Sequence, residues 1–152
     1  MASVLRARGI DFDRATLATY RRINVSIWTD YREGRIDQNR LPTERARRLL
    51  VSLGASTRGA ADLGRAYLKA FSGRGDLFPG CRSTLRRLGR RYRLGVVTNG
   101  IDRVQRSRLA VSGLAAHFEV VVTSEKAGCA KPDPRIMQLA LEQLRLEPGQ
   151  AL

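Results

Sequence analysis

The chain of 152 residues contains no apolar run that approaches the roughly 20 residues needed to span a membrane, and no apolar segment near Met1 suited to a signal peptide. We therefore expect a cytoplasmic protein with no membrane partner. Its two cysteines, Cys81 and Cys129, lie far apart without a CxxC neighbour, which favours reduced thiols over a disulfide or a metal site. The only histidine, His117, has no partner residue nearby and is expected to be structural or exposed.

Acidic residues are also scarce, because 14 Asp and Glu face 28 Lys and Arg, which gives a formal charge of +14. A surface of this kind attracts nucleic acid or anionic substrates. The basic residues recur along several expected helices without aromatic side chains for base stacking, so we interpret them as solvated helix faces and consider a nucleic-acid partner unlikely. They are Arg45, Arg47, Arg48, Arg86, Arg87, Arg90 and Arg91. An arginine-rich nucleic-acid-binding module remains the alternative, with binding that falls steeply with salt and weakens on substitution of Arg86 and Arg90.

The first half of the chain has the pattern of a helical domain, which we place at residues 1–73. Apolar residues recur at steps of three and four from Asp13 to about Tyr31, with Asp11 or Asp13 as the N-terminal cap. Further helices are expected up to Leu50 and from Thr57 to Phe71, before a glycine-rich break at residues 73–76.

The second half, residues 76–152, alternates short β-rich runs with helical ones. Strands are expected at Leu94–Thr98 and Phe118–Thr123, between helices at Arg82–Arg90, Ile101–Val111 and Asp133–Leu144. This rhythm predicts an α/β fold with a parallel, Rossmann-like sheet. Because both runs are almost continuously apolar, we expect the sheet to be covered on both faces.

Ligands of such sheets bind beyond the carboxyl ends of the strands. The first strand ends at Thr98-Asn99-Gly100, which leads directly into a helix. A threonine hydroxyl, unpaired backbone amides and the helix dipole together suit a phosphate group. The same residues are also those of an ordinary strand-to-helix turn with Thr98 as the cap, and spacing alone leaves both interpretations open.

After the second strand, Lys131 precedes a helix whose first turn contains prolines. An ammonium fixed there would neutralise a dianion at the same edge of the sheet. Lys131 could instead be an ordinary solvated surface lysine. The presence of Thr98 after the first strand makes this alternative less favourable.

These residues resemble the haloacid dehalogenase-like hydrolases, mostly Mg²⁺-dependent phosphatases. The resemblance covers the second half of the chain, and the first half is similar to the helical cap of the capped branch, in particular of its pyrimidine 5′-nucleotidase-like members. The segments that carry it are Leu77–Gly80, Val96–Gly100, Ser112–Phe118, Ser124-Glu125, Gly128–Pro132 and, in the cap, Ile27–Gly34.

The resemblance implies hydrolysis of a small phosphorylated substrate through an aspartyl-phosphate, with Mg²⁺. It assigns Thr98, Asn99 and Gly100 to phosphate binding and Lys131 to both phosphate binding and catalysis. Thr98 matches the family's second motif and Lys131 the third. Fixed donors and a cation are what phosphoryl transfer requires, because charge spreads over its oxygens.

The first and fourth motifs are not identifiable. Asp11-Phe12-Asp13 has the spacing of the nucleophile motif, but the segment before it is too charged and short to be a buried strand, so we expect a helix cap. No metal ligands can be assigned. We therefore expect a truncated, inactive chain. It would consist of an N-terminal helical cap and a partial Rossmann-like core, and the uncovered edge of the core's sheet would favour association.

Overall fold

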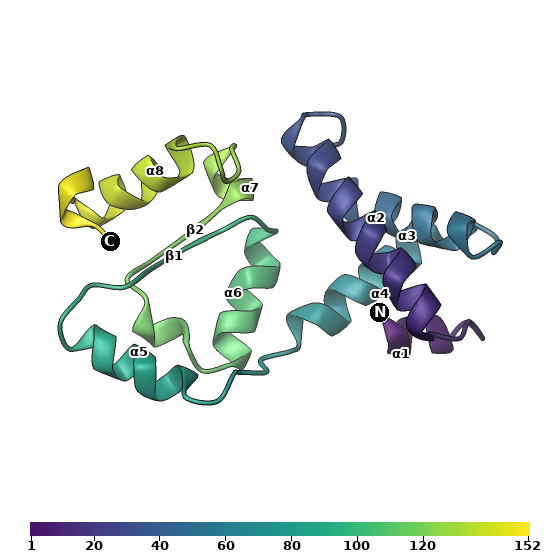
Figure 1. The fold of residues 1–152 in the computed structure, drawn as a ribbon, viewed down its shortest axis with the longest axis horizontal. Helices are drawn as coiled ribbons and strands as arrows, with labels where there is room; N and C mark the ends of the chain where they lie inside the picture. The colour runs from purple at the N-terminus through teal and green to yellow at the C-terminus, as the bar shows by residue number, and fades with distance from the viewer. The chain divides into compact units, whose positions relative to one another are not determined.

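The computed structural model describes all residues, 1–152. They form two compact units, Met1–Phe71 and Ser72–Leu152, which we call unit 1 and unit 2 (Figure 1). None of the helices combines the length and the apolar character that crossing a bilayer requires.

Unit 1 is helical, as the sequence pattern predicts. Its elements are α1 (Ala2–Arg6), α2 (Arg14–Arg32), α3 (Leu41–Ser52) and α4 (Ala60–Ser72), which ends at the boundary with unit 2. Of the two proposed caps of α2, Asp13 fills the role, because its carboxylate accepts a hydrogen bond from the Thr16 amide at 2.7 Å. This bond lowers the pKa of Asp13. The segment before Asp11 contains the short helix α1 and no strand.

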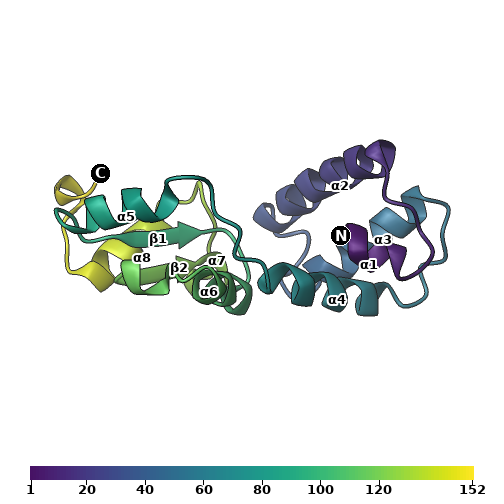
Figure 2. The ribbon, with the colours of Figure 1, turned by 90° about the horizontal axis from the view of Figure 1, so that it is seen from below.

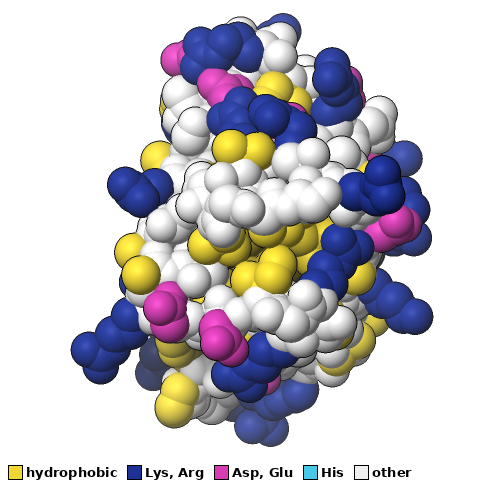
Figure 3. Space-filling model, turned by 90° about the vertical axis from the view of Figure 1, so that its right-hand side faces the viewer, with side chains coloured by type: hydrophobic (Ala, Val, Ile, Leu, Met, Phe, Trp, Pro, Cys, Tyr) yellow, Lys and Arg dark blue, Asp and Glu magenta, His cyan; other side chains and the backbone are white.

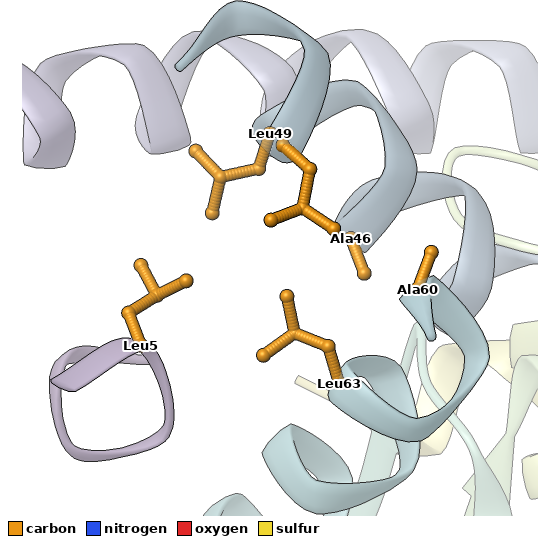
Figure 4. Close-up of a cluster of buried hydrophobic side chains, with 6 residues drawn as sticks. Leu5, Ala46, Leu49, Ala60 and Leu63 are labelled. Atoms are coloured by element: carbon orange, nitrogen blue, oxygen red, sulfur yellow. The ribbon is translucent and has the colours of Figure 1, made fainter. Parts of the chain in front are cut away.

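The core of unit 1 gathers small and medium apolar side chains from three helices (Figure 4). They are Leu5 from α1, Ala46, Leu49 and Leu50 from α3, and Ala60 and Leu63 from α4. Helices α3 and α4 approach closely at Gly64, where an added Cβ would lie 2.7 Å from the Pro42 backbone. A glycine is therefore required at this contact.

Arg45 corrects the interpretation of the basic residues. It was grouped with solvated helix faces, but it is 6% exposed and lies on the buried face of α3 between Leu41 and Leu49. Its neighbours Arg47 and Arg48 keep more contact with solvent. Arg45 lies four residues from each of these leucines, so its helical position already indicates burial, whereas its residue type alone does not.

Unit 2 contains a two-stranded parallel sheet, which confirms the α/β class (Figure 2). Its elements are α5 (Cys81–Gly89), β1 (Gly95–Thr98), α6 (Asp102–Val111), a 3-10 turn (Ala115–His117), β2 (Val120–Thr123), α7 (Ser124–Ala127), α8 (Arg135–Leu144) and a second 3-10 turn (Pro148–Gln150). Helix α8 packs on one side of the strands, and α5 and α6 lie on the other (Figure 1). The short helix α7 was not expected from the sequence.

The sheet is less covered than the apolar runs suggested. Strand β2 is mostly buried, and Val122 packs with Ile136 and Ala140 of α8, whereas β1 is only half-buried and its first residue, Gly95, is exposed. Helix α5 has no buried residue at all. The expectation of a sheet buried on both faces is therefore wrong for β1, because β2 is its only strand neighbour and α8 packs mainly on β2.

Candidate phosphate-binding site

The register of the two strands brings the predicted site residues to one edge. Thr98 pairs with Thr123, so β1 and β2 end side by side in the same direction. The loop that follows β1 and the segment that follows β2 therefore start at the same edge of the sheet. This is the edge at which parallel α/β sheets bind their ligands.

Asn99 and Lys131 are joined at this edge by two hydrogen bonds. The Asn99 amide donates from Nδ2 to the Lys131 carbonyl at 2.9 Å, and the Lys131 backbone amide donates to Asn99 Oδ1 at 2.8 Å. We call this pair of bonds the Asn99 clasp. It ties together two segments that lie 32 residues apart in the sequence.

The Lys131 side chain turns back to the sheet. Its ammonium donates to the Val97 carbonyl at 2.8 Å, one residue before Thr98. The structure therefore places the cation at the carboxyl end of β1, beside the threonine with which the sequence grouped it. An ammonium has three donors, so two remain for a ligand.

The turn amides are less available than the sequence suggested. The Gly100 amide donates to Ser124 Oγ at 3.0 Å, and the first amide of α6, on Asp102, donates to Glu125 Oε2 at 2.6 Å. Both of these N–H groups are therefore occupied, and the geometry gives no support to phosphate binding by the Gly100 amide. The acidic Glu125 also occupies the positive end of the α6 dipole.

Ser124 and Glu125 belong to a segment that carries the family resemblance, but the sequence predicted no role for either of them in the site. Ser124 is fully buried and follows β2 directly. Their position at the end of a strand is the signal that could have identified them, because side chains there reach the loop after the adjacent parallel strand.

Thr98 is the residue whose hydroxyl is left for a ligand. It makes no side-chain hydrogen bond, although the polar groups around it are paired with one another. A hydroxyl and an ammonium that face the same phosphoryl group can bind two of its oxygens, one by a neutral and one by a charge-assisted hydrogen bond. The free donors of this edge are therefore Thr98 and Lys131.

The acidic residues near this edge do not fit a magnesium ion. No group of three potential ligands occurs in the chain. The Asp102 carboxylate accepts from Thr123 at 3.1 Å and pairs with Arg106, and Glu125 binds the amide of α6. Mg²⁺ demands a near-octahedral set of oxygen ligands, and these carboxylates are already occupied by protein donors.

One observation favours the alternative of an arginine-rich nucleic-acid-binding module, and another speaks against it. Many basic residues are paired with carboxylates, and on the face shown in Figure 3 acidic side chains lie beside several of the scattered basic ones. The exposed Arg86, Arg87, Arg90 and Arg91 form no ion pair. A shallow hollow of about 310 Å³ at the start of α5 includes Arg86 in its wall, but not Thr98 or Lys131. Nucleic-acid binding by these arginines therefore remains the alternative. It would use a surface other than the sheet edge that carries Thr98 and Lys131.

Comparison with known proteins identifies the family of this chain. Residues 4–152 match the haloacid dehalogenase-like hydrolase family. The chain is 32% identical over 138 residues to pyrimidine 5′-nucleotidase YjjG of Escherichia coli, covering 88% of this chain and 58% of that protein. It is 31% identical over 134 residues to pyrimidine 5′-nucleotidase PynA of Streptococcus pneumoniae, covering 88% of this chain and 56% of that protein.

A solved structure extends the similarity to the fold. The magnesium-bound HAD-hydrolase YfnB of Bacillus subtilis superposes with a TM-score of 0.83 at 26% identity, covering 91% of this chain and 62% of that one. The chain thus spans less than two thirds of the length of these relatives. Family match, sequence similarity and fold agree over nearly the whole chain, and the protein belongs to the haloacid dehalogenase-like hydrolases.

Proposed function

We propose that this protein is a phosphate monoester hydrolase and that the present chain supplies the groups that hold the phosphoryl group. The observation that carries the proposal is the Lys131 ammonium, which donates to the Val97 carbonyl at 2.8 Å, at the strand end where Thr98 has a free hydroxyl. The names of the relatives support a small phosphorylated substrate, and two of them, both pyrimidine 5′-nucleotidases, favour a nucleotide.

Each residue has a distinct task in this proposal. Thr98 donates a hydrogen bond to one phosphoryl oxygen, and Lys131 compensates the negative charge that develops as the phosphoryl group is transferred. Asn99 keeps the two at a fixed separation through its clasp on the Lys131 backbone. Because these donors are held before the ligand arrives, little reorganisation accompanies binding.

The remaining chemistry of the family is not assigned to residues of this chain. The resemblance implies an aspartate nucleophile and Mg²⁺, which would neutralise phosphate charge. Asp13 is used as a helix cap, Asp11 follows a helix instead of a strand, and no carboxylate set fits the metal. A cytoplasmic location and association through the β1 edge also remain predictions from the sequence.

Phosphate binding tests the proposal directly. Inorganic phosphate is titrated into ¹⁵N-labelled chain at constant ionic strength, and the amide shifts of Thr98 and Lys131 are followed. We expect Thr98→Val and Lys131→Ala to weaken binding by about tenfold or more, since each removes a hydrogen bond to an anion. Lys126→Ala in α7 is the matched control, because it removes the same charge nearby and leaves the edge intact. Equal losses in Lys126→Ala and Lys131→Ala would reduce the effect to general electrostatics and contradict the site.

Hydrolysis distinguishes phosphate binding from activity. We expect the 152-residue chain to leave p-nitrophenyl phosphate intact in the presence of Mg²⁺. Turnover that disappears in Asp11→Asn would show that Asp11 supplies the nucleophile, and would overturn the expectation of a truncated, inactive chain.

A further inference from the structure

Unit 1 contains a buried cation with no ion-pair partner. Arg45 is 6% exposed and takes part in none of the ion pairs of the chain. Its Nε is the one fully buried side-chain nitrogen or oxygen that lacks a hydrogen bond. Buried polar groups are almost always paired, so an exception calls for a specific explanation.

The acidic residues of α2 and α3, Asp30 and Glu44, are already bound to other arginines. Glu44 binds Arg47 and Arg48, and Asp30 binds Arg35 and Arg48. Neither forms an ion pair with Arg45. A buried guanidinium without a counter-charge is poorly suited to stabilising a fold, because its lost hydration is not repaid.

Aromatic rings from two other helices surround the guanidinium instead. Its central carbon lies 5.9 Å from the ring centre of Trp28, on α2, and 5.7 Å from that of Tyr67, on α4. Tyr67 is itself held by a 2.8 Å hydrogen bond from Tyr20 and by stacking on Phe71 at 5.7 Å. Burial raises the pKa of Tyr20, so its hydroxyl remains neutral and offers no counter-charge.

This environment has two chemical properties. The guanidinium presents a planar fork of donors that matches two acceptors lying side by side in one plane. The rings supply flat apolar surface on which a planar group can stack, and they stabilise the cation without using its N–H donors. A tetrahedral anion would use the donors but not the stacking surface.

We propose that Arg45, Trp28 and Tyr67 form a recognition site in unit 1 for a small planar group with two adjacent hydrogen-bond acceptors, such as a carboxylate or the acceptor edge of a nucleobase. The site is built entirely within unit 1 and does not depend on the phosphate-binding residues of unit 2.

The chain carries its own reporter of this site, because Trp28 is its only tryptophan. Its emission is excited at the red edge of its absorption, where the probes do not absorb, and followed while benzoate, cytidine or inorganic phosphate is added at constant ionic strength. Benzoate presents a planar carboxylate, and cytidine an uncharged nucleobase edge. We expect a saturable change with at least one of these two, and the one that produces it identifies the source of the planar group.

Variants at Arg45 separate recognition from structure. Arg45→Lys keeps the charge but removes the fork, and Arg45→Met keeps the length but removes both. We expect each to weaken the response about tenfold or more, because charge-assisted hydrogen bonds to the probe are lost. Arg47→Met, an exposed arginine on the same helix, is the matched control and should respond like the unaltered chain.

Thermal stability provides a second readout. Without ligand, Arg45→Met should unfold at the same temperature as the unaltered chain or higher, because an unpaired buried charge is removed. The effective probe should raise the Tm of the unaltered chain but not that of Arg45→Met. No saturable response to benzoate or cytidine in the unaltered chain, an equal response to phosphate, or a response that survives in Arg45→Met would each overturn the proposal. Since the first two outcomes need no variant, the test does not depend on how the variants fold.

Discussion

The Asn99 clasp leads to the sharpest prediction of this structure. Replacing Asn99 by alanine removes two hydrogen bonds of 2.8 and 2.9 Å, which connect the end of β1 to the segment that carries Lys131. Hydrogen bonds of this kind contribute roughly 0.5–1.5 kcal/mol each. The contact is exposed, so water replaces part of what is lost, and we expect a destabilisation of about 1–2 kcal/mol.

Two measurements follow the consequences of Asn99→Ala. Thermal unfolding, followed by circular dichroism, should show a Tm lower by several degrees for a chain of this length. Hydrogen exchange of the Lys131 amide should become faster, because this amide loses its acceptor. Phosphate affinity should fall as well, because the segment that carries Lys131 is no longer tied to the end of β1.

Asn39→Ala is the matched control. Asn39 is also exposed, lies in unit 1, and its side chain takes part in no hydrogen bond, so its removal should change neither Tm nor exchange at Lys131. If Asn99→Ala behaves like Asn39→Ala in all three measurements, the clasp does not position Lys131 and the reasoning fails.

Two further predictions concern unit 1. Hydrogen bonds from Arg47 and Arg48 lower the pKa of Glu44 to about 2. The ion pairs of Glu44 therefore stabilise the fold fully at pH values above the ordinary glutamate pKa, and this stabilisation is lost as the pH falls towards 2. Glu44→Gln should therefore cost about 1 kcal/mol at neutral pH and almost nothing near pH 2, measured by urea unfolding at both values. Gly64→Ala should destabilise by about 1–3 kcal/mol despite the better helix propensity of alanine, because its Cβ would collide with backbone 2.7 Å away. Gly89→Ala in α5, where the nearest atom is 3.9 Å away, should be neutral or stabilising in the same thermal scan.

The sequence predicted most of the helices and both strands, because their apolar periods are regular. The missed elements are short: α1 and α7 have five and four residues, too few to show a period. The family resemblance grouped Thr98 with Lys131, and the strand register explains why β1 and the segment that leads to Lys131 share one edge of the sheet. The clasp could not be predicted, because an asparagine after a strand looks like a turn residue until the segment that it binds is known.

Arg45 shows the opposite limitation. Composition grouped it with the other arginines, whereas its place between Leu41 and Leu49 on one helix face already predicted burial. The sequence could not show that the neighbouring acids, Glu44 and Asp30, are bound to other arginines. Whether a buried charge is paired depends on the competition among all nearby partners, which only the packed structure reveals.

The two proposed sites share one physical property, the contrast between paired and unpaired polar groups. At the sheet edge, the loops are fixed by hydrogen bonds within the protein, which are made by the backbone amides of Gly100 and Asp102 and by the Asn99 side chain. The Thr98 hydroxyl remains free. In unit 1, Tyr20 and Tyr67 bind each other, while the buried Nε of Arg45 has no hydrogen-bond partner. A protein that only maximised its stability would satisfy these donors internally, because an unpaired buried group is costly. Ligand recognition requires free donors that are held in place by surrounding groups whose own hydrogen bonds are satisfied. The ligand then supplies the partners that the free donors lack.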